Sequence, residues 1–318
     1  ERNGKQVAVV GGGPAGLSCA FELAKLGYAV TIFDKDGLGG VPKSSIPSFR
    51  LTDEELQTDL RFLSGHFTFR RQEVDVAGIE ALTGEFDALF LAVGLGTDRL
   101  LRIGGEHLDG VIPVLRFLEE AKSIRASMPV GNRVVVVGGG NVSLDAAATA
   151  KRLGASSVLL VYRRSEAEMK VWKTELAEAR RQGVEFNFLT VPVELVGDEG
   201  GHVAGVRCRK TSLSANRDSS GRPVPVEIPG SEQVIPAETV IIAIGQDIEH
   251  RLFSGLKRDG RSYLAVNQDF QTSTPGIFAG GDAIAGEGTI VQSVAHGKQA
   301  AHSIHRSLNK KAGTGVSR

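Results

Sequence analysis

Apolar and polar positions follow the same order in two distant parts of the chain: a short apolar run, then glycines, then an amphipathic helical stripe. In the first copy the apolar residues 7–10 run directly into Gly11, Gly13 and Gly16. The spacing predicts a buried strand, a tight turn and a helix. This is the dinucleotide-binding fingerprint, in which the first glycine makes the turn, the second admits a pyrophosphate and the third lets helix and strand pack closely. The helix N-terminus would supply free N–H groups to the phosphates.

The second copy begins at residue 132 and lies at a constant offset of 127 residues, so that Gly138 and Gly140 correspond to Gly11 and Gly13. Internal repetition on this scale predicts two copies of one nucleotide-binding unit. Gly16 is replaced by Ser143 in the second copy. The fingerprint tolerates a small residue there, at some cost in the closeness of helix and strand.

The two copies differ at the end of the second strand. In the first copy Asp34 follows the apolar run 29–33, where a carboxylate can accept hydrogen bonds from ribose hydroxyls. In the second copy Tyr162 takes that place, and Arg163 and Arg164 follow at once. Two guanidinium groups suit a 2′-phosphate, which a carboxylate would repel. The first site is therefore predicted to take a dinucleotide without a 2′-phosphate, and the second to take NADP.

An alternative for the two arginines is a solvated helix cap that faces Glu166 and Glu168. Their place behind a second dinucleotide motif favours the phosphate interpretation. Farther along, helical spacing indicates that Trp172 is a core residue rather than a stacking platform. The polar stretch 214–221 predicts a flexible hairpin tip.

Helix signals are clear elsewhere in the chain. Thr52 and Glu55 form a predicted capping box that opens a helix, and residues 112–124 predict another helix. Short strands are expected near residues 68–69 and over 86–94 and 239–245. The turn at 245–246 is where the chain is expected to return to the first domain.

Composition narrows the function classes. Among 318 residues, 37 Lys and Arg balance 37 Asp and Glu, so no net field favours nucleic acid or an anionic membrane. No apolar run approaches the roughly 18 residues of a membrane span, and no signal peptide is apparent at the N-terminus. Cys19 and Cys208 are the only cysteines, which excludes a CxxC pair and a four-cysteine cluster. We expect a cytoplasmic protein without a metal site; the helical His296, His302 and His305 are expected to be solvated or capping residues.

These patterns predict an α/β protein with two Rossmann-like dinucleotide-binding domains, the second inserted in the first. The predicted first domain is discontinuous and comprises residues 1–110 and 247–318. The predicted NADP domain comprises residues 111–246. The first strand begins only a few residues into the chain, which is typical of the start of a domain.

The motifs resemble those of flavoproteins with two dinucleotide-binding domains, the pyridine nucleotide-disulfide oxidoreductase superfamily, which shares the architecture of thioredoxin reductase. The likeness is closer to the glutamate synthase small (beta) subunit family and to the flavin–NADPH half of dihydropyrimidine dehydrogenase. The specific signal is IPSFRL at residues 46–51, after the pair Gly39–Gly40. Broader matches are residues 138–142 with Asp145, 162–164 with 168–169, 243–245 and 277–282.

The resemblance implies FAD in the first site. Asp282 would bind the ribityl chain, and the helix that opens at Thr289 would point its positive end at the flavin, which favours the anionic reduced form. The residues implied to surround FAD are Gly11, Gly13, Pro14, Ala15, Gly16, Asp34, Lys35, Gly40, Val41, Ile46, Val74, Ala92, Val93, Gly94, Gly281, Asp282, Thr289 and Ile290.

NADP is expected in the second site. The residues expected to surround NADP(H) are Gly138, Gly140, Asn141, Val142, Tyr162, Arg163, Arg164, Ala243, Ile244 and Gly245. No side chain is expected to act as acid or base, because hydride passes from NADPH to the flavin.

Two departures from the resembled families decide the expected electron route. Disulfide reductases need paired cysteines near the flavin, and residues 41–49 contain none. The glutamate synthase-like family carries an N-terminal cysteine-rich domain with iron–sulfur clusters, and this sequence does not contain it. We therefore expect electrons to leave to an iron–sulfur acceptor on a partner chain, such as a larger catalytic subunit, or on a missing N-terminal segment. A flavin monooxygenase-like oxidase and a non-catalytic redox-sensing subunit that binds FAD and NADP remain as alternatives.

Overall fold

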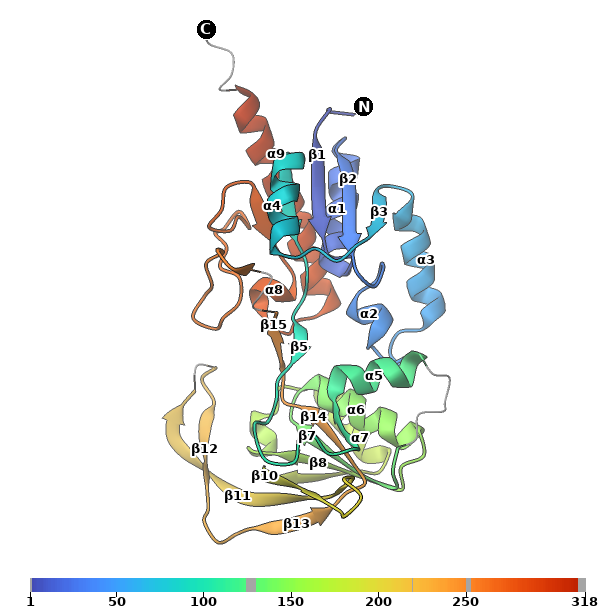
Figure 1. The fold of residues 1–318 in the computed structure, drawn as a ribbon, viewed down its shortest axis with the longest axis vertical. Helices are drawn as coiled ribbons and strands as arrows, with labels where there is room; N and C mark the ends of the chain where they lie inside the picture. The colour runs from blue at the N-terminus through green and yellow to red at the C-terminus, as the bar shows by residue number, and fades with distance from the viewer. Residues whose placement is uncertain (1, 124–129, 219, 250–252, 314–318) are drawn as a thin grey trace. The chain divides into compact units, whose positions relative to one another are not determined.

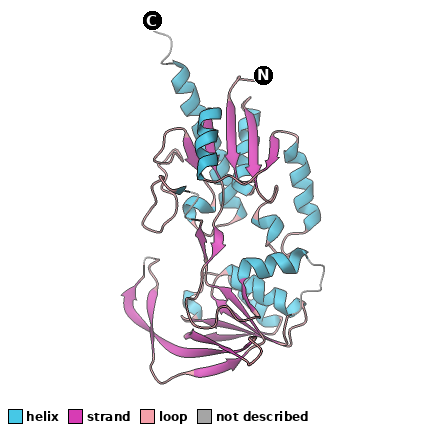
Figure 2. Ribbon diagram, viewed as in Figure 1, coloured by secondary structure: helices cyan, strands magenta, loops and turns pink. Residues whose placement is uncertain are grey.

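The computed structural model of the chain describes residues 2–123, 130–218, 220–249 and 253–313. The chain forms two compact units, residues 1–97 with 246–318 (unit 1) and residues 98–245 (unit 2). Both units contain helices and strands (Figure 2). No helix in the described ranges is both long enough and apolar enough to cross a membrane.

Unit 1 is built on a five-stranded parallel sheet (Figure 1). Its strands lie in the order β16-β4-β1-β2-β3, which places the fingerprint strand in the middle. Strands on both sides of β1 bury it completely from Val7 to Val9. The bounds are β1 Gln6–Val10, β2 Ala29–Asp34, β3 Thr68–Arg71, β4 Ala88–Leu91 and β16 Ile277–Ala279.

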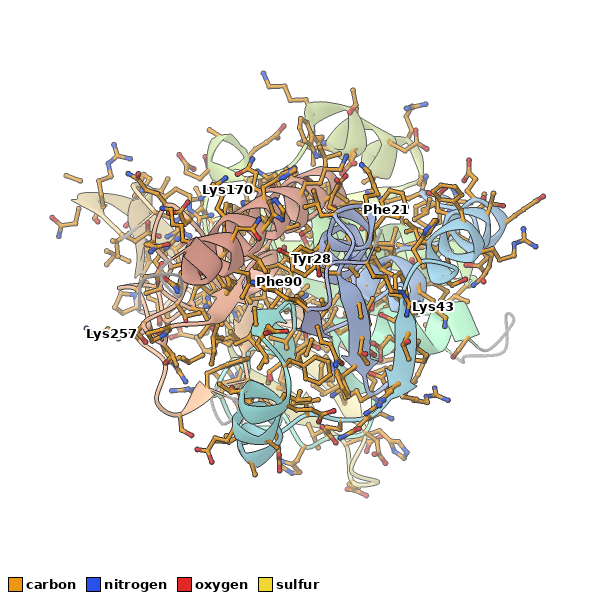
Figure 3. All side chains as sticks on the ribbon, turned by 90° about the horizontal axis from the view of Figure 1, so that it is seen from above. Phe21, Tyr28, Lys43, Phe90, Lys170 and Lys257 are labelled. Atoms are coloured by element: carbon orange, nitrogen blue, oxygen red, sulfur yellow. The ribbon has the colours of Figure 1, made fainter. Side chains whose placement is uncertain are left out.

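The helices of unit 1 enclose an apolar core around this sheet. In Figure 3 the buried Phe90 of β4 lies in the interior of unit 1, whereas Lys257 lies at its periphery. The predicted capping box is present, since Thr52 and Glu55 cap each other's backbone at the start of α3. The bounds are α1 Pro14–Lys25, α2 Val41–Ser44, α3 Asp53–Ser64, α4 Val76–Glu85, α8 Asp282–Ala285 and α9 Ile290–Gly313.

Unit 2 repeats the design with a second five-stranded parallel sheet, β6-β14-β7-β8-β9. The repeat seen in the sequence is also a repeat of strand order, except that the edge strand β6 precedes its sheet partners in sequence whereas β16 of unit 1 follows them. The predicted helix at 112–124 begins slightly later, because residues 111–113 extend the sheet as β6. The bounds are β6 Val111–Pro113, α5 Val114–Ser123, β7 Arg133–Gly138, α6 Asn141–Arg152, β8 Ser157–Tyr162, α7 Lys173–Arg181, β9 Val184–Phe188 and β14 Thr239–Ala243.

Between β9 and β14 the chain forms an antiparallel sheet that unit 1 lacks among its described residues. Strand β11 pairs with three neighbours, and its far end forms a hairpin with β12. The predicted polar tip at 214–221 is partly wrong, since residues 214–217 continue β11 and only 218–222 connect the strands. The bounds are β10 Thr190–Gly197, β11 Val203–Arg217, β12 Pro223–Glu227 and β13 Gln233–Pro236.

The chain passes between the units at two places. The first division lies after Thr97 rather than near residue 110. Residues 98–110 belong to unit 2 because they bind its strands: the Gly104 carbonyl accepts a hydrogen bond from the Leu195 N–H, and Val203 N–H donates to Asp109. The second division lies between Gly245 and Gln246, at the turn where the sequence places the return. Strands β5 Gly96–Asp98 and β15 Gln246–Ile248 pair at these crossings.

Candidate functional site

The glycines of the first turn stand where no side chain fits. A Cβ built on Gly11 would lie 2.2 Å from the Ala92 carbonyl oxygen at the end of β4, and Gly11 has a φ of +109°. A Cβ on Gly16 would lie 1.9 Å from the Gly11 carbonyl oxygen. Strand, turn and helix are therefore in contact along their backbones, as the fingerprint requires.

Helix α1 presents an N-terminus that the described side chains leave uncapped. Gly13 is its N-cap, Pro14 occupies the first turn, and no side chain accepts a hydrogen bond from the first N–H groups. The heavy atom nearest to a Cβ built on Gly13 would be the Cα of Gly40, at 3.9 Å. The exposed backbone and the helix dipole make this turn a site for an anion such as a pyrophosphate.

A second glycine loop closes on the first. Gly39 N–H donates to the Gly12 carbonyl at 2.8 Å, and a Cβ on Gly40 would lie 2.8 Å from the Cα of Gly13. Val41 then opens the short helix α2, and its side chain is exposed. The Ile46 N–H donates back to the Val41 carbonyl. The loop predicted to lie by the flavin thus borders the pyrophosphate turn directly.

Asp34 at the end of β2 holds this turn. One carboxylate oxygen accepts the Gly12 N–H at 2.7 Å, and the other accepts the N–H groups of Asp36 and Gly37 at 2.8 and 2.9 Å. A carboxylate has about four acceptor positions, so one remains for a ribose hydroxyl. The following Lys35 side chain is exposed.

Asp282 reaches the same region from the C-terminal part of unit 1. A Cβ on the preceding Gly281 would lie 3.0 Å from the Cβ of Ala15 in α1. Burial, reinforced by the charge of Glu287, raises the pKa of Asp282 to about 6, although hydrogen bonds from Ser293 and the Gly288 backbone lower it. A half-buried carboxyl group with a raised pKa marks a candidate ligand site.

Helix α9 begins where the sequence predicts, after Thr289, which caps it. The Thr289 hydroxyl accepts the Gln292 N–H, and the Gln292 side chain accepts the Thr289 N–H. Ile290, the first helical residue, is 40% exposed. Among the remaining FAD candidates, Val93 and Gly94 follow β4, whereas Val74 is buried in the apolar core of unit 1 and leaves only its backbone for a ligand.

The second turn has the backbone contacts of the first. A Cβ on Gly138 would lie 2.2 Å from the Ala243 carbonyl oxygen at the end of β14, just as Gly11 meets Ala92. Ser143 replaces Gly16 and its hydroxyl donates to the Gly140 carbonyl at 2.5 Å. Ile244 and Gly245 follow β14 and are half-buried.

Helix α6 also begins without a side-chain cap, at Gly140. A Cβ on Gly140 would have no heavy atom within 4 Å. Asn141 opens the helix, and its buried Oδ1 has no hydrogen-bond partner among the described residues. Val142 beside it is half-buried. A buried acceptor without a partner at an uncapped helix N-terminus indicates that a ligand with donor groups belongs here.

Tyr162 holds the second turn by packing rather than by charge. A Cβ on Gly139 would lie 2.2 Å from the Tyr162 ring, and the phenol hydroxyl donates to the Glu168 carbonyl at 3.1 Å. The ring is 6% exposed. Tyr162 thus occupies the position of Asp34 without offering a carboxylate.

The two arginines after Tyr162 have different roles. Arg163 is exposed and its guanidinium makes no hydrogen bond or ion pair with the described residues. Arg164 is 2% exposed and pairs with Asp218 at 2.6 Å, so its side chain is not available to a phosphate. The prediction that both arginines read a 2′-phosphate is therefore wrong for Arg164. Its partner lies 54 residues away in sequence, and no local pattern announces it.

The alternative interpretation of these arginines, a cap facing two glutamates, is also wrong. Glu166 pairs with Arg180, and Glu168 accepts the Ser165 N–H and hydroxyl. Trp172, expected in the core, is 61% exposed because α7 starts after it, at Lys173. Sequence reasoning also missed Arg222, whose Nη1 lies 3.4 Å from the Tyr162 hydroxyl.

Neither cysteine is built for thiol chemistry. Cys19 and Cys208 are both free and both fully buried. Burial raises the pKa of the Cys19 thiol well above its ordinary value and that of Cys208 to about 12. Thiols in this environment remain protonated and unreactive.

Residues 5–301 match the family described as pyridine nucleotide-disulphide oxidoreductase. The chain belongs to this family. Membership in it agrees with the class that the sequence predicts, a pyridine nucleotide-dependent oxidoreductase.

Several curated proteins are similar over nearly the whole chain. The chain is 39% identical to the beta subunit of NADP(+)-dependent formate dehydrogenase from Moorella thermoacetica, covering 97% of this chain and 44% of that protein. It is 34% identical to the glutamate synthase [NADPH] small chain of Escherichia coli K12, covering 96% and 69%. It is 35% identical to the NADPH-Fe(3+) oxidoreductase subunit beta of Geobacter sulfurreducens, covering 96% and 50%. The chain spans about half the length of most of these relatives.

Solved structures support the fold. FprA of Mycobacterium tuberculosis in complex with NADPH aligns with a TM-score of 0.82 at 21% identity, over 99% of this chain and 87% of that one. Thioredoxin reductase of T. acidophilum aligns with a TM-score of 0.72 at 20% identity, over 97% and 99%. The predicted α/β fold with Rossmann-like units is thereby confirmed.

Proposed function

We propose that this chain is the FAD- and NADPH-binding part of a flavoprotein that takes hydride from NADPH and passes electrons singly to an iron–sulfur acceptor. The observation that carries the proposal is the pair of matching turns whose second strands end differently, in Asp34 and in Arg163. Two dinucleotide sites of opposite charge preference in one chain suit one dinucleotide without and one with a 2′-phosphate.

The first turn fits FAD. The uncapped N-terminus of α1 at Gly13 would bind the pyrophosphate, and the open acceptor position of Asp34 would take a ribose hydroxyl. Asp282 would accept from the ribityl chain, and the start of α9 at Thr289 would face the flavin with its positive end. When bound, FAD accepts a hydride with two electrons and releases them one at a time.

The second turn fits NADP(H). The N-terminus of α6 at Gly140 would bind the pyrophosphate, and the unpartnered Asn141 amide oxygen would accept a donor of the ligand. The free guanidinium of Arg163 would bind the 2′-phosphate. The names of the formate dehydrogenase, glutamate synthase and NADPH-Fe(3+) relatives all specify NADP or NADPH, which supports this choice.

We propose an iron–sulfur acceptor because the two cysteine thiols of this sequence are excluded as electron carriers. Two isolated, buried cysteines with raised pKa values cannot form a redox-active pair. Several relatives are named as beta subunits or small chains, which supports a partner chain as the place of the acceptor.

The first experiment measures the cofactors. Purified protein should contain about one FAD per chain, and anaerobic NADPH should bleach its visible absorbance much faster than NADH does. Release of FMN on denaturation, or no flavin after reconstitution, would contradict the assignment of unit 1. Equal bleaching by both nucleotides would contradict the assignment of unit 2.

The second experiment measures the acceptor by steady-state NADPH oxidation. Ferricyanide, a one-electron stand-in for an iron–sulfur centre, should be reduced readily, whereas dithionitrobenzoate and thioredoxin should be reduced at a trace rate. Fast disulfide reduction that survives Cys19→Ala together with Cys208→Ala would disprove the proposed electron route. Stoichiometric peroxide or oxygenated product in air would favour the monooxygenase-like alternative.

A further inference from the structure

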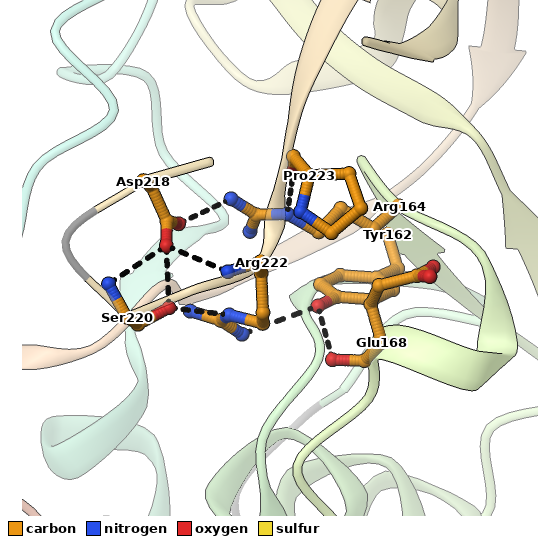
Figure 4. A network of polar contacts seen from close by, with 7 residues as sticks. All are labelled: Tyr162, Arg164, Glu168, Asp218, Ser220, Arg222 and Pro223. Carbon is orange, nitrogen blue, oxygen red and sulfur yellow. Dashed lines mark hydrogen bonds and ion pairs between the residues drawn. The ribbon is translucent and has the colours of Figure 1, made fainter. Parts of the chain in front are cut away.

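The buried arginine of unit 2 joins the end of β8 to a distant hairpin. Arg164 Nε donates to the Pro223 carbonyl at 2.8 Å, and its Nη2 pairs with Asp218 at 2.6 Å. Asp218 and Pro223 flank the turn between β11 and β12 (Figure 4). A second link is the Thr211 hydroxyl, which donates to the Arg163 carbonyl at 2.9 Å. The hairpin is therefore fixed to the strand end that carries the candidate 2′-phosphate residue.

Asp218 organises the tip of this hairpin. Its second oxygen accepts the Ser220 N–H, the Ser220 hydroxyl and the Arg222 N–H at 2.6 to 3.1 Å. The Ser220 hydroxyl bond above all, with these backbone bonds and the charge of Arg164, holds the pKa of Asp218 well below its ordinary value. Asp218 is thus a carboxylate whose charge is matched by Arg164.

The tip directs Arg222 toward the dinucleotide turn. Its Nε donates to the Ser220 hydroxyl at 2.8 Å, and its Nη1 lies 3.4 Å from the Tyr162 hydroxyl (Figure 4). The Tyr162 ring in turn packs on Gly139 of the turn. Arg222 therefore reaches the same strand end as Arg163, from a segment 60 residues away.

The guanidinium groups of Arg163 and Arg222 are positively charged, and no carboxylate among the described residues forms an ion pair with either. Asp218 is taken by Arg164, and neither Arg163 nor the Arg222 guanidinium forms an ion pair among the described residues. Partial desolvation first, and then repulsion from Arg164 and Arg222, lowers the pKa of Arg163, although Tyr162 and Asp218 oppose this shift. Two guanidiniums at one strand end, neither with an ion-pair partner among the described residues, suit a doubly charged phosphate.

We infer that Arg222 is the second 2′-phosphate residue of the NADP site, in the place that the sequence pattern gives to Arg164. Arg164 and Asp218 are positioning residues, which hold the hairpin so that Arg222 lies beside Arg163. This inference rests on the proposed assignment of unit 2 to NADP(H). It adds a specificity determinant that comes from the antiparallel sheet rather than from the Rossmann fold.

The test is calorimetric binding of 2′,5′-ADP and of 5′-AMP to the full-length flavin-loaded chain. Arg222→Ala should weaken 2′,5′-ADP binding about tenfold or more, the value of one charge-assisted hydrogen bond, and leave 5′-AMP unchanged. Arg222→Lys should recover part of the loss because it keeps the charge but not the fork of donors. Arg207→Ala is the matched control, since Arg207 lies on the same strand β11 and pairs with Glu194 instead.

The outcomes separate this inference from the proposed function. If wild-type protein binds 2′,5′-ADP no better than 5′-AMP, the NADP assignment itself fails. If wild-type protein prefers 2′,5′-ADP but Arg222→Ala behaves like Arg207→Ala, the proposed function stands and the role of Arg222 is overturned.

The role of Arg164 and Asp218 must be tested with a measurement that does not change when the fold is merely destabilised. Asp218→Asn weakens the tie between hairpin and strand but keeps its size and its hydrogen-bond acceptor. It should reduce the preference for 2′,5′-ADP over 5′-AMP, by less than Arg222→Ala does. A variant that melts earlier but retains the full preference would show that Arg164 and Asp218 serve the fold alone.

Discussion

The two dinucleotide turns share a backbone and differ in how the end of the second strand is used. In unit 1 one side chain has both tasks: Asp34 binds three backbone N–H groups of the turn region and keeps an acceptor position for a ligand. In unit 2 the tasks are divided. Tyr162 packs on the turn, Arg164 is buried as a tie to the hairpin, and Arg163 alone remains open.

This division has a physical reason. A carboxylate accepts several N–H groups at once, so it can hold a turn and still bind a hydroxyl. A guanidinium only donates, and therefore cannot satisfy the N–H groups of the turn. A strand end that carries arginines must therefore hold its turn by other means, and in unit 2 the Tyr162 ring packs on Gly139.

The largest expected effect concerns the closeness of helix and strand in unit 1. Gly16→Ser would place a Cβ 1.9 Å from the Gly11 carbonyl oxygen, so strand or helix must move. We expect a loss of roughly 3 kcal/mol or more in the free energy of unfolding, together with loss of flavin. Ala24→Ser on the same helix is the control. Denaturant unfolding that shows equal stability for both variants would contradict the backbone contact.

The next effect tests the division of tasks directly. Arg163→Ala should weaken NADPH binding about ten- to a hundredfold without changing the melting temperature, because the side chain has no partner among the described residues. Asp34→Ala should weaken FAD binding and also destabilise the protein, by roughly 1–2 kcal/mol for the lost bonds to half-buried N–H groups. Thermal melts with titrations of both ligands measure this. A fall in stability for Arg163→Ala, or none for Asp34→Ala, would break the comparison.

A smaller effect follows from Asp282, which has no counterpart described in unit 2. Its pKa rises from an ordinary 3.8 to about 6 on folding, so the protonated form is favoured in the native apoprotein. This contribution is fully present below the ordinary value and is lost as the pH rises through about 6. Asp282→Asn should therefore stabilise the apoprotein at neutral pH, by on the order of 1–3 kcal/mol, and little at acidic pH. Parallel pH–stability curves for the two proteins would refute the shift.

The smallest effect is expected from the reverse substitution in unit 2, serine to glycine at residue 143. Ser143→Gly removes the hydroxyl bond to the Gly140 carbonyl and puts glycine inside α6. The free energy of unfolding is expected to fall by roughly 1–2 kcal/mol, from the lost hydrogen bond and from the glycine in the helix. Ser143→Ala separates them, because it removes the bond and keeps helix propensity. A gain of stability in Ser143→Gly would show that unit 2, like unit 1, prefers backbone contact there.

Features set by nearby residues were predictable. The strand–glycine–helix units follow from periodicity and glycine spacing over residues 7–24, and the capping box at Thr52 follows from residues three apart. Such signals are local, because they depend on backbone geometry within one or two turns. The constant offset between the copies predicted two copies of one nucleotide-binding unit, and both units contain a five-stranded parallel sheet.

Features set by distant residues were not predictable. The sequence by itself determined that there are two dinucleotide turns, and that one ends in an acid and the other in bases. Only the tertiary structure decided which base is open, because Asp218 neutralises Arg164 from a hairpin whose register depends on strand pairing. It also decided that Trp172 is exposed and that residues 98–110 join unit 2. Burial and ion pairing are properties of segments brought together by folding, and the order of residues along the chain does not state them.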